Sequence, residues 1–232
     1  MRHLLNSLYV TTQGAYLARD GETVAVRIEH ETRLRVPIHT LGGIVCFGQV
    51  SCSPPLMQLC AERGVRISHL SEYGRFWARI EGPVSGNVLL RRQQYRWADN
   101  PEKSAEIARA VVVSKIANQR TVLLRDLRDH PENPGRQDIQ KAIQAMERQL
   151  NLLREPAPLD TVRGMEGDAA RQYFSVFDHL IVAEKDEFFF RERSRRPPLD
   201  KMNALLSFLY TLLVHDVRSS LETVGLDPAV GF

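Results

Sequence analysis

Residues 17–28, LARDGETVAVRI, decide how the first part of this chain folds. Asp20-Gly21 stands between two apolar runs, and Val24, Val26 and Ile28 recur at every second position of the second run. An Asp-Gly pair supplies the positive φ angles that a two-residue type I′ turn requires, and a period of two is typical of a half-buried strand. The stretch therefore predicts a β-hairpin.

Strand and helix signals continue on the C-terminal side of the hairpin. Arg33–Pro37 alternates again, while Gly42–Phe47 and Val65–Leu70 are short apolar runs that indicate strands. Between them, Ser53-Pro54 offers a helix cap followed by a proline at the first helical position, and Gly64 marks the end of that helix. Roughly the first seventy residues thus predict a β-rich domain with one helix.

The periodicity becomes helical from about Gly82 onwards. Helices are expected from Asn100-Pro101, over Ile139–Leu153, from near Thr161 as a candidate cap toward Val182, and over about Asp200–Thr223. We therefore expect an α+β protein. It comprises a small β-rich N-terminal domain over residues 1–73, a hinge over 74–86 and an all-α domain over 87–232.

Composition and charge exclude several classes of protein. The chain has 232 residues, 31 Lys and Arg against 28 Asp and Glu, and 43% hydrophobic residues, which is typical of a globular protein. The apolar stretch near Ala204–Val214 is shorter than the ~20 residues of a membrane span, and the N-terminus shows no signal-peptide pattern. Cys46, Cys52 and Cys60 form no CxxC pair, so neither a disulfide framework nor a zinc site is expected. We expect a cytoplasmic protein with no membrane partner.

Residues 163–170, RGMEGDAA, carry the most informative acidic residue. Glu166 has small neighbours, so a bulky ligand could approach it closely. A carboxylate suits Mg²⁺ or Mn²⁺, and such an ion can polarise a phosphodiester. Glu166 is also compatible with an ordinary first-turn acid that the helix dipole favours, because acids are routine in the first turn of a helix. The residues alone leave both interpretations open.

Basic residues gather in two places. Between Val84 and His130 there are nine basic residues against five acidic ones, and a face of this kind attracts duplex DNA through counterion release. Further on, Phe188-Phe189-Phe190 precedes a loop containing Arg195 and Arg196, a composition that suits a phosphate backbone and splayed bases. Both segments are also compatible with a solvated surface, with the phenylalanines filling the core.

Three motifs in order resemble one family. They are residues 164–174, GMEGDAARQYF, residues 195–210, RRPPLDKMNALLSFLY, and residues 225–232, GLDPAVGF. They are similar to the integrase of the CRISPR adaptation machinery, the endonuclease that inserts spacers, and residues 4–10, LLNSLYV, resemble its first strand. The resemblance covers nearly the whole chain and is closest to the subtype that accompanies type I-C systems.

The resemblance implies a β-rich domain that dimerises and a helical catalytic domain. It makes Glu166 the catalytic residue and first ligand for Mg²⁺ or Mn²⁺, and places Asn203 and Tyr210 at the active-site wall beside DNA. The family's other ligands, a histidine and an aspartate, are expected beyond Phe232, so the chain is expected to lack a C-terminal part. The candidate DNA-binding residues are Arg163, Arg195, Arg196, Asn203 and Tyr210.

The implied reaction is transesterification, in which the 3′-hydroxyl of a spacer attacks a phosphodiester of the CRISPR array. The implied partners are spacer-precursor DNA, the CRISPR repeat, branched DNA, a second copy of the chain and a small ferredoxin-like adaptation protein. With one carboxylate, this chain is expected to be inactive or weakly active. Two alternatives are a non-catalytic DNA-binding or assembly module, in which Glu166 only caps a helix, and an RNA-binding helical protein.

Overall fold

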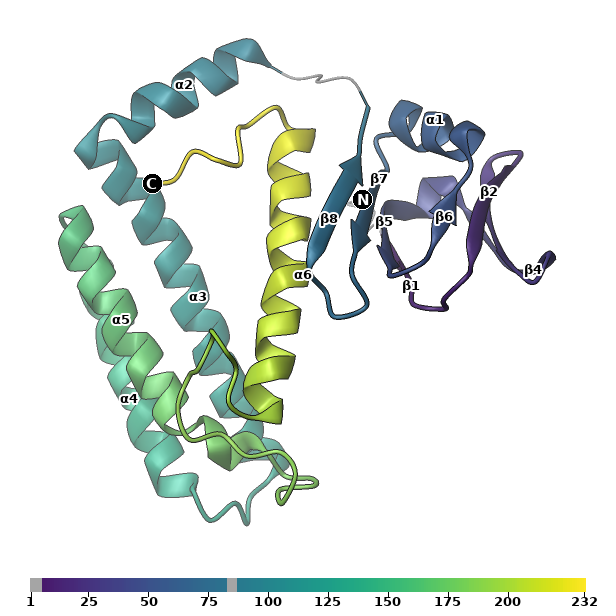
Figure 1. Ribbon diagram of the computed structural model, residues 1–232. Helices are drawn as coiled ribbons and strands as arrows, with labels where there is room; N and C mark the ends of the chain where they lie inside the picture. The colour runs from purple at the N-terminus through teal and green to yellow at the C-terminus, as the bar shows by residue number, and fades with distance from the viewer. Residues whose placement is uncertain (1–5, 83–86) are drawn as a thin grey trace. The chain divides into compact units, whose positions relative to one another are not determined.

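The computed structural model describes residues 6–82 and 87–232, apart from the side chain of Ser219. The chain forms two compact units: one built from Met1–Asn87 with Phe208–Leu226, the other from Val88–Ser207 with Asp227–Phe232. Every described strand lies in the N-terminal region, and long helices follow it (Figure 1). The predicted α+β class, with a β-rich region before a helical one, is confirmed.

The strands of the first unit form two four-stranded sheets. The first sheet has the order β1 (Asn6–Val10), β5 (Leu41–Phe47), β7 (Arg66–Leu70) and β8 (Phe76–Ile80). Its first three strands are parallel and β8 is antiparallel. The second sheet has the order β4 (Glu31–Pro37), β3 (Thr23–Ile28), β2 (Tyr16–Asp20) and β6 (Ser51–Cys52), and a 3₁₀ turn over Ile38–Thr40 connects β4 to β5.

The predicted hairpin is present, with a different turn. Asp20 on β2 pairs with Thr23 on β3, so Gly21 and Glu22 form the two-residue loop. Gly21 has a φ of +60°, whereas Glu22 does not adopt a positive φ. A positive φ at the first central residue alone defines a type II′ turn, so the expectation of a type I′ turn is wrong. Glycine at this position is what type II′ demands.

The core of the first unit unites strands of both sheets with helix α1 (Pro54–Glu62). Leu17 and Val24 of the hairpin, Ile44 of β5 and Leu56 of α1 are almost completely buried in it. The predicted cap of α1 is confirmed, because the backbone N–H of Leu56 donates to Ser53 Oγ over 3.3 Å. Apolar alternation in the strands and one capped helix are thus enough to enclose this core.

The first unit extends beyond the predicted boundary at residue 73. Strand β8 lies inside the predicted hinge, whose residues 83–86 fall outside the described ones. Moreover, Phe208 and Leu212 of helix α6 (Lys201–Thr223) pack against Val45, Phe47 and Leu70. A sheet whose two faces are both apolar needs cover on both, and the later part of α6 supplies the second cover.

The second unit is helical, as expected. It contains α2 (Val88–Ala98), α3 (Pro101–Asp129), α4 (Arg136–Leu152), α5 (Leu159–Ser175) and a 3₁₀ turn over Phe177–Leu180. Helices α3, α4 and α5 pack side by side around buried residues such as Leu123, Ile139 and Met146 (Figure 1). Asn100 caps α3 as predicted, by accepting from the N–H of Lys103 over 2.9 Å. Thr161 is not the cap of α5, because that helix starts at Leu159, directly after Pro158.

The hydropathy of the helices agrees with the composition. Within the described residues, no helix combines the length and the apolar character that crossing a bilayer requires. Even α6, with 23 residues, carries polar and charged side chains along its length.

Candidate metal and nucleic-acid site

Glu166 lies near the middle of α5, at the border of the face that packs against α3. Val162 and Ala169, one turn before and after it, are buried in the helical core, while the Glu166 side chain is 31% exposed. Its carboxylate oxygen Oε1 forms an ion pair with the Nζ of Lys115 on α3. Because an i, i+4 spacing places residues on one helix face, core packing by Val162 directs Glu166 toward α3.

The surface around Glu166 is open, as its small neighbours predicted. A Cβ atom built at Gly164 or at Gly167 would meet no heavy atom within 4 Å beyond the adjacent residues and the backbone of α5 itself. Both glycines lie within two residues of Glu166 on α5. A large ligand can therefore approach this turn of α5 without a steric barrier from either position.

The ligand set around Glu166 fits a divalent ion only in part. Its carboxylate is a hard oxygen donor of the kind that Mg²⁺ prefers. Among the residues that the structure describes, however, Glu166 belongs to no group of three or more histidine, cysteine or carboxylate ligands. The ammonium of Lys115 also occupies the place beside Oε1 that a cation would take. These residues alone therefore do not complete a metal site.

Asn203 is not the exposed DNA contact that the resemblance implies. Its side chain is 0% exposed, in the first turn of α6. Its Oδ1 accepts from Arg193 over 2.8 Å and from the N–H of Ser194 over 3.1 Å, and its Nδ2 donates to the carbonyl of Glu192 over 2.8 Å and to Asp200 over 2.6 Å. All the hydrogen-bonding groups of this side chain are used internally, so in this structure it holds the loop and presents no group to DNA.

The basic loop before α6 has a phenylalanine in the core, as one interpretation of its composition expected, and exposed arginines, as the other expected. Phe190 is buried, stacks against Phe174 and meets Phe177 edge to face, so it anchors the loop in the core. Arg195 and Arg196 are exposed, and neither takes part in an ion pair among the described residues. Exposed guanidinium groups on an anchored loop can bind phosphate oxygens at a small cost in entropy.

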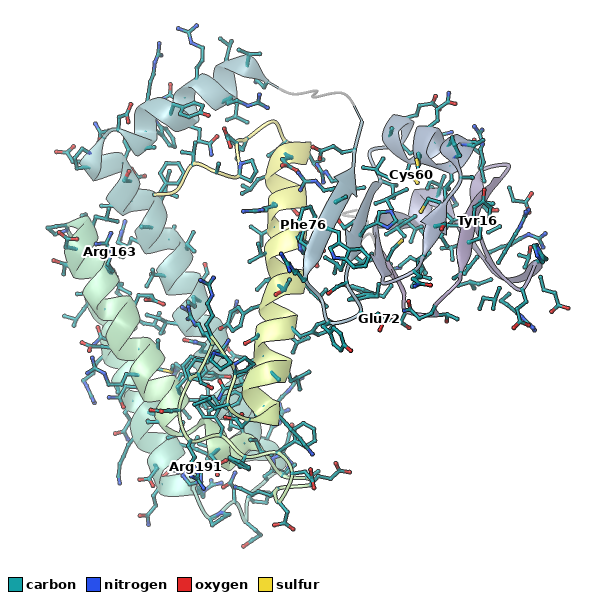
Figure 2. The ribbon with its side chains drawn as sticks, viewed as in Figure 1. Tyr16, Cys60, Glu72, Phe76, Arg163 and Arg191 are labelled. Carbon is teal, nitrogen blue, oxygen red and sulfur yellow. The ribbon has the colours of Figure 1, made fainter. Side chains whose placement is uncertain are left out.

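The remaining candidates lie on separate elements. Arg163 projects from α5, three residues before Glu166, and pairs with Asp160 over 2.9 Å (Figure 2). It is exposed and remains available to a phosphate. Tyr210 is 43% exposed on the part of α6 that belongs to the first unit, whereas Glu166, Arg163 and the basic loop belong to the second.

Two features of the structure, one at Glu166 and one in the first unit, had no clear signal in the sequence. Lys115 appears there only as one of nine basic residues between Val84 and His130, and its pairing with Glu166 depends on the packing of α3 against α5. In the first unit, Cys46, Cys52 and His69 converge from three strands, although their spacing along the chain indicated no metal site.

Comparison of the sequence with known proteins identifies the family of this chain. Residues 8–232 match the model of the family described as CRISPR associated protein Cas1. The chain is 52% identical over 232 residues to CRISPR-associated endonuclease Cas1 1 of Chlorobaculum tepidum, and the match covers 100% of this chain and 68% of that relative.

Solved structures with the same fold agree with that match. The Cas1 protein of Thermotoga maritima, TM1797, superimposes with a TM-score of 0.72 at 24% identity, covering 98% of this chain and 69% of that one. A chain of a Cas6-RT-Cas1–Cas2 complex superimposes with a TM-score of 0.69 at 21% identity, covering 96% and 24%. The family match spans nearly the whole sequence, and the chain belongs to the Cas1 family of CRISPR-associated proteins.

Proposed function

We propose that this chain is the DNA-binding body and part of the catalytic centre of a CRISPR adaptation endonuclease and integrase, acting in the cytoplasm. Its substrates are spacer-precursor DNA, the CRISPR repeat and branched DNA. The observation that carries the proposal is Glu166, a half-exposed carboxylate on an open turn of α5 in a chain whose relatives are named endonucleases.

Each part of the proposed site has a distinct task. Glu166 would hold one position of a Mg²⁺ or Mn²⁺ ion, which polarises a scissile phosphodiester when bound. Lys115 neutralises Glu166 while no cation is present. Once a cation is bound to Glu166, the ammonium of Lys115 is free to pair with a phosphate oxygen. Arg163, Arg195 and Arg196 bind the DNA backbone, which sets the register of the substrate without reading its sequence.

One carboxylate gives a weak site. Mg²⁺ requires near-octahedral oxygen coordination, which protein carboxylates and substrate phosphates share. We therefore propose that these 232 residues bind the ion weakly and cleave branched DNA slowly or not at all. The test is Mg²⁺-dependent cleavage of branched DNA, with the longer Chlorobaculum tepidum endonuclease as positive control. Robust cleavage by this chain that Glu166→Ala abolishes would contradict the proposed inactivity.

The ion pair between Lys115 and Glu166 competes with metal binding, so its removal should change the affinity for Mn²⁺. Lys115→Met is expected to raise the affinity for Mn²⁺ about 1.4- to fivefold, because an exposed ion pair that competes with the metal is worth about 0.2–1 kcal/mol. Glu166→Gln is expected to remove the site. Mn²⁺ titration followed by electron paramagnetic resonance measures both.

A matched control separates this effect from a general change in charge. Lys141→Met removes the lysine of another exposed ion pair, with Asp138 at 2.8 Å on α4, and should leave Mn²⁺ affinity unchanged. If Glu166→Gln binds Mn²⁺ as well as the parent chain, Glu166 is not a ligand. The ion pair with Lys115 then favours the alternative, a non-catalytic DNA-binding or assembly module.

Two protein partners complete the proposal. Strand β1 is an edge strand of the first sheet and could pair with its copy across a two-fold axis, which would give a homodimer. Residues 4 and 5, which precede this strand in the segment that resembles the family's first strand, lie outside the described residues. The second partner is the small ferredoxin-like adaptation protein. Elution at the monomer mass over a wide concentration range would argue against the homodimer.

A further inference from the structure

Cys46, Cys52 and His69 form a cluster that the proposed nuclease function does not use. Cys46 on β5 and His69 on β7 are register partners on neighbouring parallel strands of the first sheet. Residues that pair in this way direct their side chains to the same face. Cys52 comes from β6, at the edge of the second sheet, so the cluster joins the two sheets.

The face that carries the cluster is the one turned toward the core shared by both sheets. Ile44 and Ile67, two residues before Cys46 and His69, are buried in that core. Val45 and Leu70, one residue away from them, pack on the opposite face against α6. The alternation of the two strands therefore directs a thiol and an imidazole inward, among apolar side chains.

The distances suit a metal with tetrahedral coordination. One ligand atom from each of the three residues lies within 4.8 Å of the other two, and Cys52 Sγ is 4.0 Å from His69 Nε2. With Zn–S bonds of about 2.3 Å and Zn–N bonds of about 2.0 Å, tetrahedral ligand atoms lie roughly 3.5–3.8 Å apart. Binding would require the three side chains to rotate until their ligand atoms reach these separations.

We propose that Cys46, Cys52 and His69 bind one Zn²⁺ ion, which ties the first sheet to the second. Thiolate and imidazole are the ligands that Zn²⁺ prefers, whereas Mg²⁺ and Mn²⁺ prefer oxygen. Cys46 is completely buried, while Cys52 and His69 are half-buried, so the ion has a path from solvent and a water molecule can complete its coordination.

The charge of the cluster also balances on metal binding. Two thiolates and a neutral imidazole around Zn²⁺ carry no net charge, which suits a site in an apolar core. The thiols of Cys46 and Cys52 release their protons to solvent when they bind the ion.

The test is Zn²⁺ binding by the whole 232-residue chain, stripped of metal and kept reduced. Competition with a chromogenic chelator should give one tightly bound Zn²⁺ per chain. Cys52→Ser should weaken binding more than about 100-fold, beyond the 10–100-fold that the loss of an outer hydrogen-bond partner causes. Co²⁺ in place of Zn²⁺ should give thiolate charge-transfer absorption in the parent chain. This measurement does not depend on any variant folding correctly.

Cys60 provides the matched control. It is a third cysteine, 1% exposed in the same core, and it is not part of the group of three ligands. Cys60→Ser should therefore retain the Zn²⁺ affinity, while Cys52→His, which keeps a metal ligand, should restore at least part of it. Absence of Co²⁺–thiolate absorption, or equal Zn²⁺ affinity in the parent chain and Cys52→Ser, would overturn the proposal. Mn²⁺ binding at Glu166 is a separate measurement, so the two proposals fail independently.

Discussion

Asn203→Ala is expected to lower the free energy of unfolding of the second unit by about 3 kcal/mol. The substitution removes a side chain that is 0% exposed and makes four hydrogen bonds to the loop before α6. It leaves the carboxylate of Asp200 and the guanidinium of Arg193 each without one of their partners in a partly buried place. An unsatisfied buried polar group costs about 1–3 kcal/mol, more when it is charged.

Urea denaturation followed by circular dichroism measures this loss, and limited proteolysis tests where it acts. Because Asn203 ties Glu192 and Ser194 to α6, cleavage within residues 181–200 should become faster. Asn151→Ala, an exposed asparagine on α4, is the control and should change the free energy of unfolding by less than about 0.5 kcal/mol. Equal stability of the two variants would show that the Asn203 network does not hold the loop.

The double variant Arg195→Ala/Arg196→Ala is expected to weaken the binding of branched DNA about 10- to 100-fold at low salt. Both guanidinium groups are exposed on the loop that Asn203 and Phe190 anchor. An arginine that neutralises one phosphate adds about one unit to the slope of log K against log salt, so the slope should fall by about two in the double variant. Fluorescence anisotropy at several salt concentrations measures the affinity and the slope together.

A control variant with the same change in net charge shows whether DNA binding depends on the loop itself or only on the total positive charge of the protein. Arg33→Ala/Arg35→Ala removes two exposed arginines from β4 in the first unit and should leave the slope unchanged. If both double variants have the same effect, the loop is not the DNA site. Competition between branched DNA and RNA at fixed salt tests whether the chain is instead an RNA-binding protein, and we expect DNA to prevail.

Secondary structure was largely predictable because its causes are local. The hairpin over Tyr16–Ile28 follows from alternation and a turn glycine, and α1 and α3 begin where Ser53 and Asn100 can accept a backbone hydrogen bond. Two local details were wrong for equally local reasons. The turn uses one positive φ instead of two, and α5 starts at Leu159 without a side-chain cap, which leaves Thr161 within the helix.

The boundary between the units was not predictable in this way. Strand β8 has five residues, as β7 does, but its place in the sheet depends on its pairing with β7. The α6 sequence is continuous, yet Asn203 belongs to one unit and Phe208 to the other. Compact units are set by packing between elements far apart in the sequence, which no local pattern reveals.

Three ordered motifs and the period of the apolar residues therefore determined, from the sequence alone, the α+β class, most helices and strands, and Glu166 as the candidate ligand. Tertiary structure decided what each polar side chain faces. It paired Glu166 with Lys115, buried Asn203 under the loop and brought Cys46, Cys52 and His69 together. The reason is physical: propensity and capping act over a few residues, whereas the surroundings of a side chain depend on which distant elements share its core.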